Sequence, residues 1–332
     1  MTAKRVKFLV IRFSSIGDIV LTSPVVRHIK CRIPDAEVHF VTKRAFAPLV
    51  ANNPYIDKIH LLDDSLAQLI NRLRAEKFDH IIDLHDNLRS FLIKRLLGVP
   101  SQTYCKNRIG RWLLVSAGIN RMKGHIVERY MKTLLPWNIG DDGKGLDFFV
   151  APDTTVDRGE LPPAFASGFA VLVAGTMHYT KQLPLEKQIE ICRGITWPIL
   201  ILGGKKEAEL GEAIVRGANR DNLVNGCGAY SLSQSALWIS LSKLVVTNDT
   251  GLMHIAAAYA KPILATYGNS VSAFGFDPYR VPASSQIFQV GLRCRPCSKF
   301  GGPACPKGHF NCMQQINSQA IVLAANAIMQ QE

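Results

Sequence analysis

The feature that most constrains the fold is a repeated alternation of short apolar strands and helical segments. In the first half of the chain, apolar and β-branched runs alternate with segments whose apolar residues have helical spacing. The alternation restarts at residue 169 and continues to residue 267. Strands that alternate with helices form parallel sheets covered on both faces. The sequence therefore predicts an α/β protein with two doubly wound, Rossmann-like domains. The expected strands are 6–12, 37–42, 59–62, 78–84, 169–174, 197–202, 223–225, 244–247 and 263–267.

The domain boundary is expected where the periodicity is lost. Residues 151–163 are rich in Pro, Asp and Gly and lack periodicity, as linkers do. We expect an N-terminal Rossmann-like domain at 1–150 and a C-terminal one at 164–313, facing each other across a cleft. Such sheets bind ligands outside the carboxyl ends of their strands. The final segment, 314–332, is expected to form a helix that packs back on the N-terminal domain or stays with the C-terminal one.

Positive charge is concentrated in the first half. The net charge is +13, and residues 1–150 hold 24 Lys/Arg against 14 Asp/Glu. Residues 89–132 contain ten basic residues and one acid. This excess favours an anionic partner, which would be a phosphorylated glycolipid, an anionic membrane surface or nucleic acid. A solvated basic face without a partner is the alternative.

The chain shows neither a signal peptide nor a spanning segment. The apolar run at 8–11 is too short for the core of a signal peptide, and no run of 18 apolar residues occurs. We therefore expect a cytoplasmic protein.

The first candidate site is the turn at 13–18, which follows the first strand. It lacks the G-x-G-x-x-G pattern of dinucleotide-binding domains. Asp18 lies at or next to a helix start, where it can act as an N-cap or, in a cleft, as a general base.

Two further candidates follow strands of the second domain. Thr250 and Gly251 open a helix after the strand at 244–247, and free N–H groups at a helix start suit a pyrophosphate. Asp249 and His254 adjoin this turn. Asp249 can be a helix cap and His254 an ordinary helix residue, or both can contact a ligand. Lys181, in the loop after the strand at 169–174, is a plausible phosphate contact.

Four cysteines cluster near the C-terminus as Cys294-x2-Cys297-x7-Cys305-x6-Cys312. In a reducing compartment such a cluster suggests zinc before disulfides. The x7 and x6 intervals depart from the paired spacing of a zinc ribbon. We therefore expect reduced thiols and no metal site, and the spacing alone leaves metal binding and disulfide formation open.

Four motifs resemble the ADP-heptose:lipopolysaccharide heptosyltransferases, glycosyltransferase family nine, and most closely the heptosyltransferase II branch. They are VIRFSSIGDIVLTSPVVRHIK at 10–30, Thr176…Lys181-x-x-Pro184, TNDTGLMHIAAAYAKPILATYG at 247–268 and CRPCSKFGGPACPKGHFNCM at 294–313. Their order spans nearly the whole chain. The resemblance implies a GT-B fold, with the acceptor on the N-terminal domain and the nucleotide sugar on the C-terminal domain. It also implies inverting transfer of heptose from ADP-heptose to the inner core of lipopolysaccharide, with neither metal nor cofactor.

The resemblance also implies roles for single residues. Asp18 would be the catalytic base. On the donor side, Thr176 and Lys181 would hold the diphosphate, with Met177 standing where the family often has a second hydroxyl. The other donor contacts would be Asp249 to the heptose, Thr250 and Gly251 to phosphate, His254 in the same pocket and Glu207, or alternatively Glu209, to the ribose. The acceptor contacts would be Ser15, Gly17, Arg89, Lys94 and Arg95.

The partners implied are ADP-heptose and a phosphorylated Kdo–lipid A type acceptor, met at the cytoplasmic face of the inner membrane, and no nucleic acid. One alternative is a sugar-nucleotide epimerase or hydrolase of the same architecture, which would need no basic acceptor surface. The other is a nucleic-acid-binding protein, against which the cysteine spacing and the lack of an exposed aromatic series argue. The core position extended, the donor sugar and the oligomeric state stay open.

Overall fold

The structure is a computed structural model that describes residues 5–63 and 65–330. The chain divides into two compact units. The first comprises Met1–Asn107 and Gly124–Ala151, and the second comprises Arg108–Lys123 and Pro152–Glu332. The first unit ends at Ala151, and residues 108–123, which were expected in the N-terminal domain, belong to the second unit. Residues 1–4 and 64 of the expected N-terminal domain and residues 331–332 of the expected final helix lie outside the described residues.

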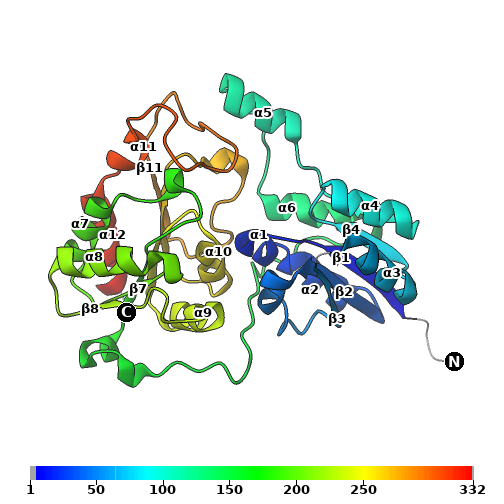
Figure 1. Cartoon of the computed structure of the whole chain (residues 1–332), viewed down its shortest axis with the longest axis horizontal. Coiled ribbons are helices and arrows are strands. Elements are labelled where there is room, and N and C mark those ends of the chain that lie inside the picture. Colours follow the sequence, from blue (N-terminus) through cyan, green and yellow to red (C-terminus); the bar gives the residue numbers. More distant parts are fainter. Residues whose placement is uncertain (1–4, 64, 331–332) are drawn as a thin grey trace. The chain divides into compact units, whose positions relative to one another are not determined.

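The first unit is built on a five-stranded sheet in the order β3-β2-β1-β4-β5, in which all neighbouring strands are parallel (Figure 1). The chain moves to one side of β1 and then to the other, so the sheet has a switch point between β1 and β4. Ligands of such sheets bind at the carboxyl ends of the strands at this point. The strands are β1 (Val6–Ile11), β2 (Ala36–Lys43), β3 (Lys58–Leu62), β4 (His80–Asp83) and β5 (Ser101–Thr103). The helices are α1 (Ile16–Val20), α2 (Ser23–Arg32), α3 (Leu66–Glu76), α4 (Leu88–Leu97) and α6 (Ile126–Met131), with 3-10 turns η1 (Arg44–Leu49) and η2 (Lys132–Trp137).

The second unit has a six-stranded parallel sheet in the order β11-β10-β9-β6-β7-β8, with its switch point between β6 and β9. Its strands are β6 (Ala170–Val173), β7 (Ile199–Leu202), β8 (Leu223–Asn225), β9 (Leu244–Asn248), β10 (Ile263–Tyr267) and β11 (Gln286–Gln289). Its helices are α5 (Arg108–Ala117), α7 (Leu185–Gly194), α8 (Ala208–Ala218), α9 (Leu232–Leu241), α10 (Gly251–Ala258), α11 (Asn311–Gln314) and α12 (Ser318–Gln330). Five 3-10 turns complete it, namely η3 (Arg158–Glu160), η4 (Pro163–Ser167), η5 (Tyr179–Lys181), η6 (Lys205–Glu207) and η7 (Ser272–Phe274).

All nine expected strands are present, and two edge strands, β5 and β11, were not predicted. Both are short and contain no fully buried residue, so they lack the buried apolar run that marks the central strands. Two buried strands, β1 and β9, end directly before the turns that the sequence singles out. The fold therefore places both turns at the ligand-binding edges of their sheets.

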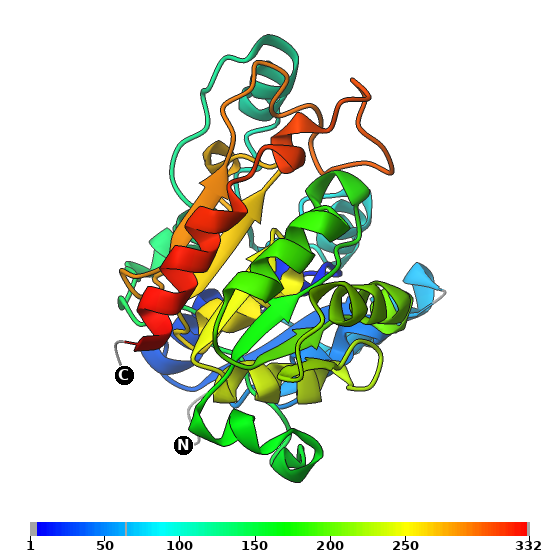
Figure 2. The same ribbon diagram turned by 90° about the vertical axis from the view of Figure 1, so that its left-hand side faces the viewer.

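The C-terminal helix α12 packs in the core of the second unit. It contacts α7, β9 and β10, and Figure 2 shows it as the red helix beside the orange and yellow strands. Ile321, Ala325 and Met329 are buried in the hydrophobic core of this unit. The amide of Asn326 binds the carbonyl oxygen of Gly194, which ends α7. Packing back on the N-terminal domain, one of the two expectations, is therefore wrong.

Within residues 5–63 and 65–330, none of the helices has the length and apolar character required to cross a bilayer.

Candidate functional site

Asp18 occupies the third position of α1 and is held by contacts on both carboxylate oxygens. One oxygen lies 2.7 Å from an Nη of Arg12, and the other accepts a hydrogen bond of 2.8 Å from the Ser15 hydroxyl. The backbone N–H of Ser15, the N-cap residue, also donates to Asp18. Asp18 is therefore not the N-cap itself, but its carboxylate supports the cap.

Arg12 fixes this carboxylate, and the sequence interpretation assigned it no role. Its side chain is buried, and it donates hydrogen bonds to the carbonyl oxygens of Ser14 and Leu84 and to the Tyr130 hydroxyl. A guanidinium with this many acceptors has one orientation. An arginine at the end of an otherwise apolar strand is the sequence signal that could have identified it, because a buried charge needs a partner.

The electrostatics keep Asp18 deprotonated. Burial alone would raise its pKa, but Arg12 and the hydrogen bonds from Ser15 outweigh burial and hold the pKa below its ordinary value. Nearby His85 packs edge-on against Phe13, and burial, with Arg12 and Lys106, lowers its pKa to about 4. At neutral pH Asp18 is therefore a carboxylate and His85 is a neutral imidazole. The Asp18 carboxylate can accept a proton from a bound hydroxyl.

The other residues predicted for the acceptor divide into two groups. Ser15 and Gly17 lie in the same turn as Asp18, whereas Arg89 and Arg95 are exposed on α4. Lys94 is different, because its ammonium lies 2.7 Å from the buried carboxylate of Asp83 and donates a hydrogen bond of 2.6 Å to Thr103. Lys94 therefore already has two partners at the ends of β4 and β5, and its role in binding an acceptor stays a prediction.

In the second unit, the sheet brings Lys181 and Asp249 together. The Nζ of Lys181 lies 2.6 Å from a carboxylate oxygen of Asp249, which also accepts a hydrogen bond of 2.5 Å from the Ser270 hydroxyl. Burial would raise the pKa of Asp249, but Lys181, Ser270 and His254 outweigh burial and lower it. Asp249 is therefore ionised, and its charge is balanced by the lysine predicted to hold phosphate.

Asn248 ties the two loops of this site together. Its side-chain oxygen accepts hydrogen bonds from the Leu183 N–H and the Thr266 hydroxyl, and its amide donates to the Val173 carbonyl oxygen. These contacts connect the end of β9 with the end of β6 and with the loop that carries Lys181. The sequence interpretation quoted Asn248 but gave it no function, although an amide at the end of a buried strand is a signal that it binds neighbouring backbone.

The remaining donor-side residues lie at the same edge of the sheet. Thr250 is the N-cap of α10 and accepts a hydrogen bond from the Leu252 N–H, so the helix begins at Gly251. His254 is buried in the first turn. Glu207, in the turn after β7, packs against Gly175 in the loop after β6. A Cβ at position 175 would lie only 2.2 Å from the Cγ of Glu207, so the close packing requires glycine there.

Two expected donor contacts already have local partners. The Thr176 hydroxyl donates to the carbonyl oxygen of His178 and accepts from its N–H. A carboxylate oxygen of Glu207 accepts a hydrogen bond from the Gly204 N–H. The alternative ribose contact, Glu209, is exposed on α8. Binding a nucleotide through Thr176 or Glu207 would use their remaining acceptor positions.

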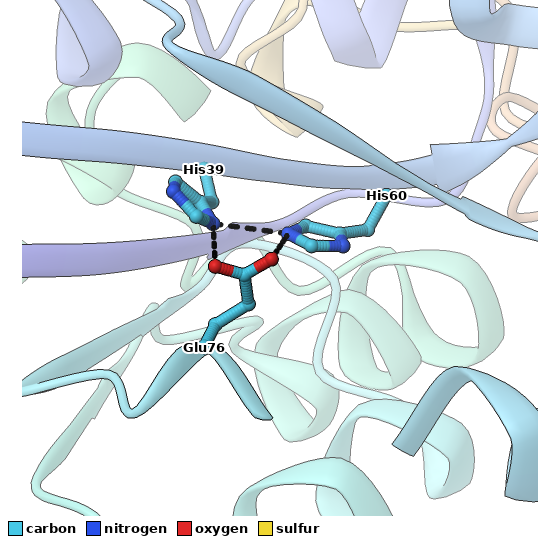
Figure 3. Close-up of side chains that lie close together, drawn as sticks. All are labelled: His39, His60 and Glu76. Atoms are coloured by element: carbon cyan, nitrogen blue, oxygen red, sulfur yellow. Dashed lines mark hydrogen bonds and ion pairs between the residues drawn. The ribbon is translucent and has the colours of Figure 1, made fainter. Parts of the chain in front are cut away.

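Within the described residues, two groups have the geometry to hold a metal ion, and neither includes a predicted site residue. They are His39, His60 and Glu76, shown in Figure 3, and His28, Asp141 and Asp142. In the first group the two imidazoles are hydrogen-bonded at 3.0 Å, and Lys58 and Lys7 lie at the Glu76 carboxylate. The ammonium groups of Lys7 and Lys58 already balance the charge of the Glu76 carboxylate, so we interpret this group as a buried polar network.

The cysteines carry no disulfide in the described chain. Burial raises the pKa of Cys297, and it raises the pKa of Cys312 to about 11. Both are therefore protonated thiols at neutral pH. That the cluster holds no structural zinc stays a prediction.

The polar network of Figure 3 should make stability depend on pH. Burial, with His39 and Lys58, lowers the pKa of His60 to about 4, whereas an unfolded histidine titrates near about 6.5. Between these two pKa values His60 is protonated in the unfolded chain but not in the folded chain. Stability is therefore lost as pH falls from about 6.5 to about 4. We expect His60 to account for about 2 kcal/mol between about pH 7 and about pH 5.

Urea denaturation at the two pH values measures this loss in wild type and His60→Gln. The variant should show a smaller difference between the two pH values. His309→Gln, at an exposed histidine, is the matched control and should keep the full difference. Equal pH dependence in wild type and His60→Gln would refute the assignment.

Comparison with known proteins identifies the family and the fold of the chain. The family model described as "Glycosyltransferase family 9 (heptosyltransferase)" matches residues 66–303. The chain is 24% identical to lipopolysaccharide heptosyltransferase 2 of Escherichia coli K12, covering 98% of this chain and 99% of that protein. The structure of E. coli ADP-heptose lps heptosyltransferase II superposes with a TM-score of 0.69 at 21% identity, covering 98% and 99% of the two chains. E. coli heptosyltransferase WaaC with ADP superposes with a TM-score of 0.67 at 19% identity, covering 97% and 99%.

The structural matches show the GT-B fold, with one Rossmann-like unit for each of the two sheets described above. The family model covers more than half of the chain, and it includes the loop of Lys181 and the turn of Asp249. The chain therefore belongs to glycosyltransferase family 9, the heptosyltransferases, and is a glycosyltransferase.

Proposed function

We propose that this glycosyltransferase moves heptose from ADP-heptose to the inner core of lipopolysaccharide, by an inverting displacement that needs no metal. The observation that carries the proposal is the chemistry at the two ligand-binding edges. The first unit presents the deprotonated carboxylate of Asp18, and the second presents the ammonium of Lys181 beside the start of α10. One base and one site for a leaving diphosphate are what such a transfer requires.

We place the donor on the second unit. Lys181 and the first N–H groups of α10 would bind the diphosphate, because a helix N-terminus and an ammonium both favour phosphate oxygens. Asp249 would then accept hydrogen bonds from hydroxyls of the heptose, and Glu207 would contact the ribose. The ADP in the name of the WaaC structure and the ADP-heptose in that of heptosyltransferase II support this donor.

In the proposed step, Asp18 accepts the proton of the attacking acceptor hydroxyl. The acceptor oxygen then bonds to the anomeric carbon, and the bond from that carbon to the diphosphate breaks. The negative charge that develops on ADP is stabilised by Lys181 and the N–H groups of α10. A single displacement inverts the configuration at the anomeric carbon. Arg12 takes no part in bond making, but it sets the orientation of the base.

We propose that the acceptor is a phosphorylated Kdo–lipid A type glycolipid, bound by the basic residues of the first unit at the cytoplasmic face of the inner membrane. Changing Arg89 and Arg95 together to Gln should raise the KM for such an acceptor by roughly threefold to tenfold and leave ADP affinity unchanged. The effect should shrink as salt rises, because exposed charges are screened within about 8 Å at physiological ionic strength. Steady-state kinetics with phosphorylated and dephosphorylated acceptors, at two salt concentrations, measures it.

Lys94→Met is the contrasting variant. It leaves the Asp83 carboxylate buried without its cation, so it should lower the free energy of unfolding by about 3–5 kcal/mol, the range for breaking a buried ion pair. If the Arg89/Arg95 double variant lost ADP binding, the assignment of the acceptor to the first unit would be wrong.

A donor panel tests the proposed function. Purified protein is incubated with a delipidated inner-core acceptor and ADP-heptose, ADP-glucose, UDP-glucose or GDP-mannose, and the products are read by mass spectrometry. We expect a mass increase of one heptose with ADP-heptose and little product with the others. Efficient transfer from another sugar nucleotide would overturn the assignment of the donor.

A further inference from the structure

The segment Arg108–Lys123, which contains α5, exposes large apolar side chains that the proposed chemistry does not use. Ile109 is 75% exposed, Trp112 is 66% exposed and Ile119 is 48% exposed. Figure 1 shows α5 set between extended connections at both ends. Exposed tryptophan and isoleucine side chains on one short segment are costly in water and mark an interaction surface.

The opposite side of this segment is fixed to the second unit. Leu114 and Met122 are buried against Phe274 in a small apolar cluster, and the Arg111 guanidinium lies 5.9 Å from the centre of the Phe274 ring. The segment is therefore held in one orientation. Its exposed apolar residues remain outside this cluster and are available to a partner.

The charge of the segment indicates what that partner is. Its sixteen residues include four basic residues and no acid, and three of the basic residues, Arg108, Arg121 and Lys123, are exposed. Basic residues around apolar and tryptophan side chains suit an anionic bilayer surface. A second copy of the chain is a poorer occupant, because two such segments would repel each other.

We propose that Arg108–Lys123 docks on anionic phospholipid, with Ile109 and Trp112 entering the boundary between headgroups and acyl chains. A helix of ten residues is too short to cross a bilayer and would lie along its surface. The proposal deepens the proposed function, because it rests on an acceptor that is anchored in a membrane. Docking would bring the enzyme to that acceptor.

Co-sedimentation of the full-length protein with vesicles tests the proposal without donor or acceptor. We expect wild type to bind vesicles of phosphatidylcholine and phosphatidylglycerol, and to bind vesicles of phosphatidylcholine alone much more weakly. The double change Ile109→Ser and Trp112→Ser should lower the partition coefficient about tenfold or more, since each buried apolar side chain contributes to interfacial binding. Leu323→Ser, at a side chain 62% exposed on α12, is the matched control and should bind as wild type does.

Fluorescence gives an independent signal. Adding anionic vesicles should shift the emission of wild type to shorter wavelength, and Trp112→Phe should remove most of this shift. Activity on a delipidated acceptor should be unchanged in the double variant, so failure of docking is distinguishable from failure of the proposed transfer.

Three results would overturn the proposal. The first is equal vesicle binding by wild type and the double variant. The second is loss of binding only on changing Leu88 and Phe91 to Ser, since these exposed side chains lie on α4. The third is self-association without vesicles that Trp112→Ser abolishes, which would make a second copy the occupant.

Discussion

Replacing Asp18 with Asn should lower kcat by about 10²–10⁴, the range for loss of a general base, and leave ADP affinity nearly unchanged. The amide keeps the size of the carboxylate and its contact with Ser15, but it cannot accept the proton of the acceptor hydroxyl. It also ends the ion pair with Arg12, whose three other hydrogen bonds remain. Single-turnover kinetics at saturating ADP-heptose measures the chemical step, and calorimetry measures ADP binding.

Ser15→Ala is the control for the structural role of Asp18. It removes the side-chain hydrogen bond to the carboxylate but retains the base, so it should cost about 1 kcal/mol of stability and far less activity. If Asp18→Asn kept near-normal kcat and showed only a similar loss of stability, Asp18 would serve the helix start and not catalysis.

Lys181→Ala should weaken ADP binding by about 1.5–3 kcal/mol, the range for hydrogen bonds to charged groups. It should also lower kcat, because the ammonium binds the departing ADP more strongly as charge develops. The loss would have a second cause, since the variant leaves the Asp249 carboxylate unbalanced beside the proposed diphosphate site. Calorimetry with ADP and steady-state kinetics measure the two effects.

Two variants separate these causes. Lys181→Ala combined with Asp249→Asn removes both charges and should bind ADP more tightly than Lys181→Ala alone. Lys187→Ala, which removes a partly buried lysine of the same unit that pairs with Glu190, should bind ADP as wild type does. An acceptor-only defect in Lys181→Ala would contradict the placement of the donor on the second unit.

The sequence predicted the part of the fold that depends on local pattern. Buried strands such as β1 and β9 are apolar runs, and their ends are marked by turn residues such as Gly17 and Gly251. Two turns that follow parallel strands of one sheet must lie at the same edge, so the proximity of Lys181 and Asp249 could be expected. The catalytic role predicted for Asp18 came from the resemblance to a family, because its position alone also suits a cap.

What the sequence did not predict depends on tertiary contacts. Lys94 is one basic residue among many until Asp83 is known to be buried beside it. The pairing of Arg12 with Asp18 requires the turn to bring residues six apart into contact. The segment 108–123 belongs to the second unit because Leu114 and Met122 pack against Phe274, a contact that no local pattern reveals.

The most direct test of the account is the release of ADP from ADP-heptose with and without an inner-core acceptor. We predict rapid release only when the acceptor is present, one heptose added to the acceptor for each ADP, and loss of this release in Asp18→Asn. Release of ADP at the same rate without acceptor, as a hydrolase would show, or conversion of ADP-heptose to an isomeric ADP-sugar, as an epimerase would show, would contradict the claim that this glycosyltransferase transfers heptose to lipopolysaccharide.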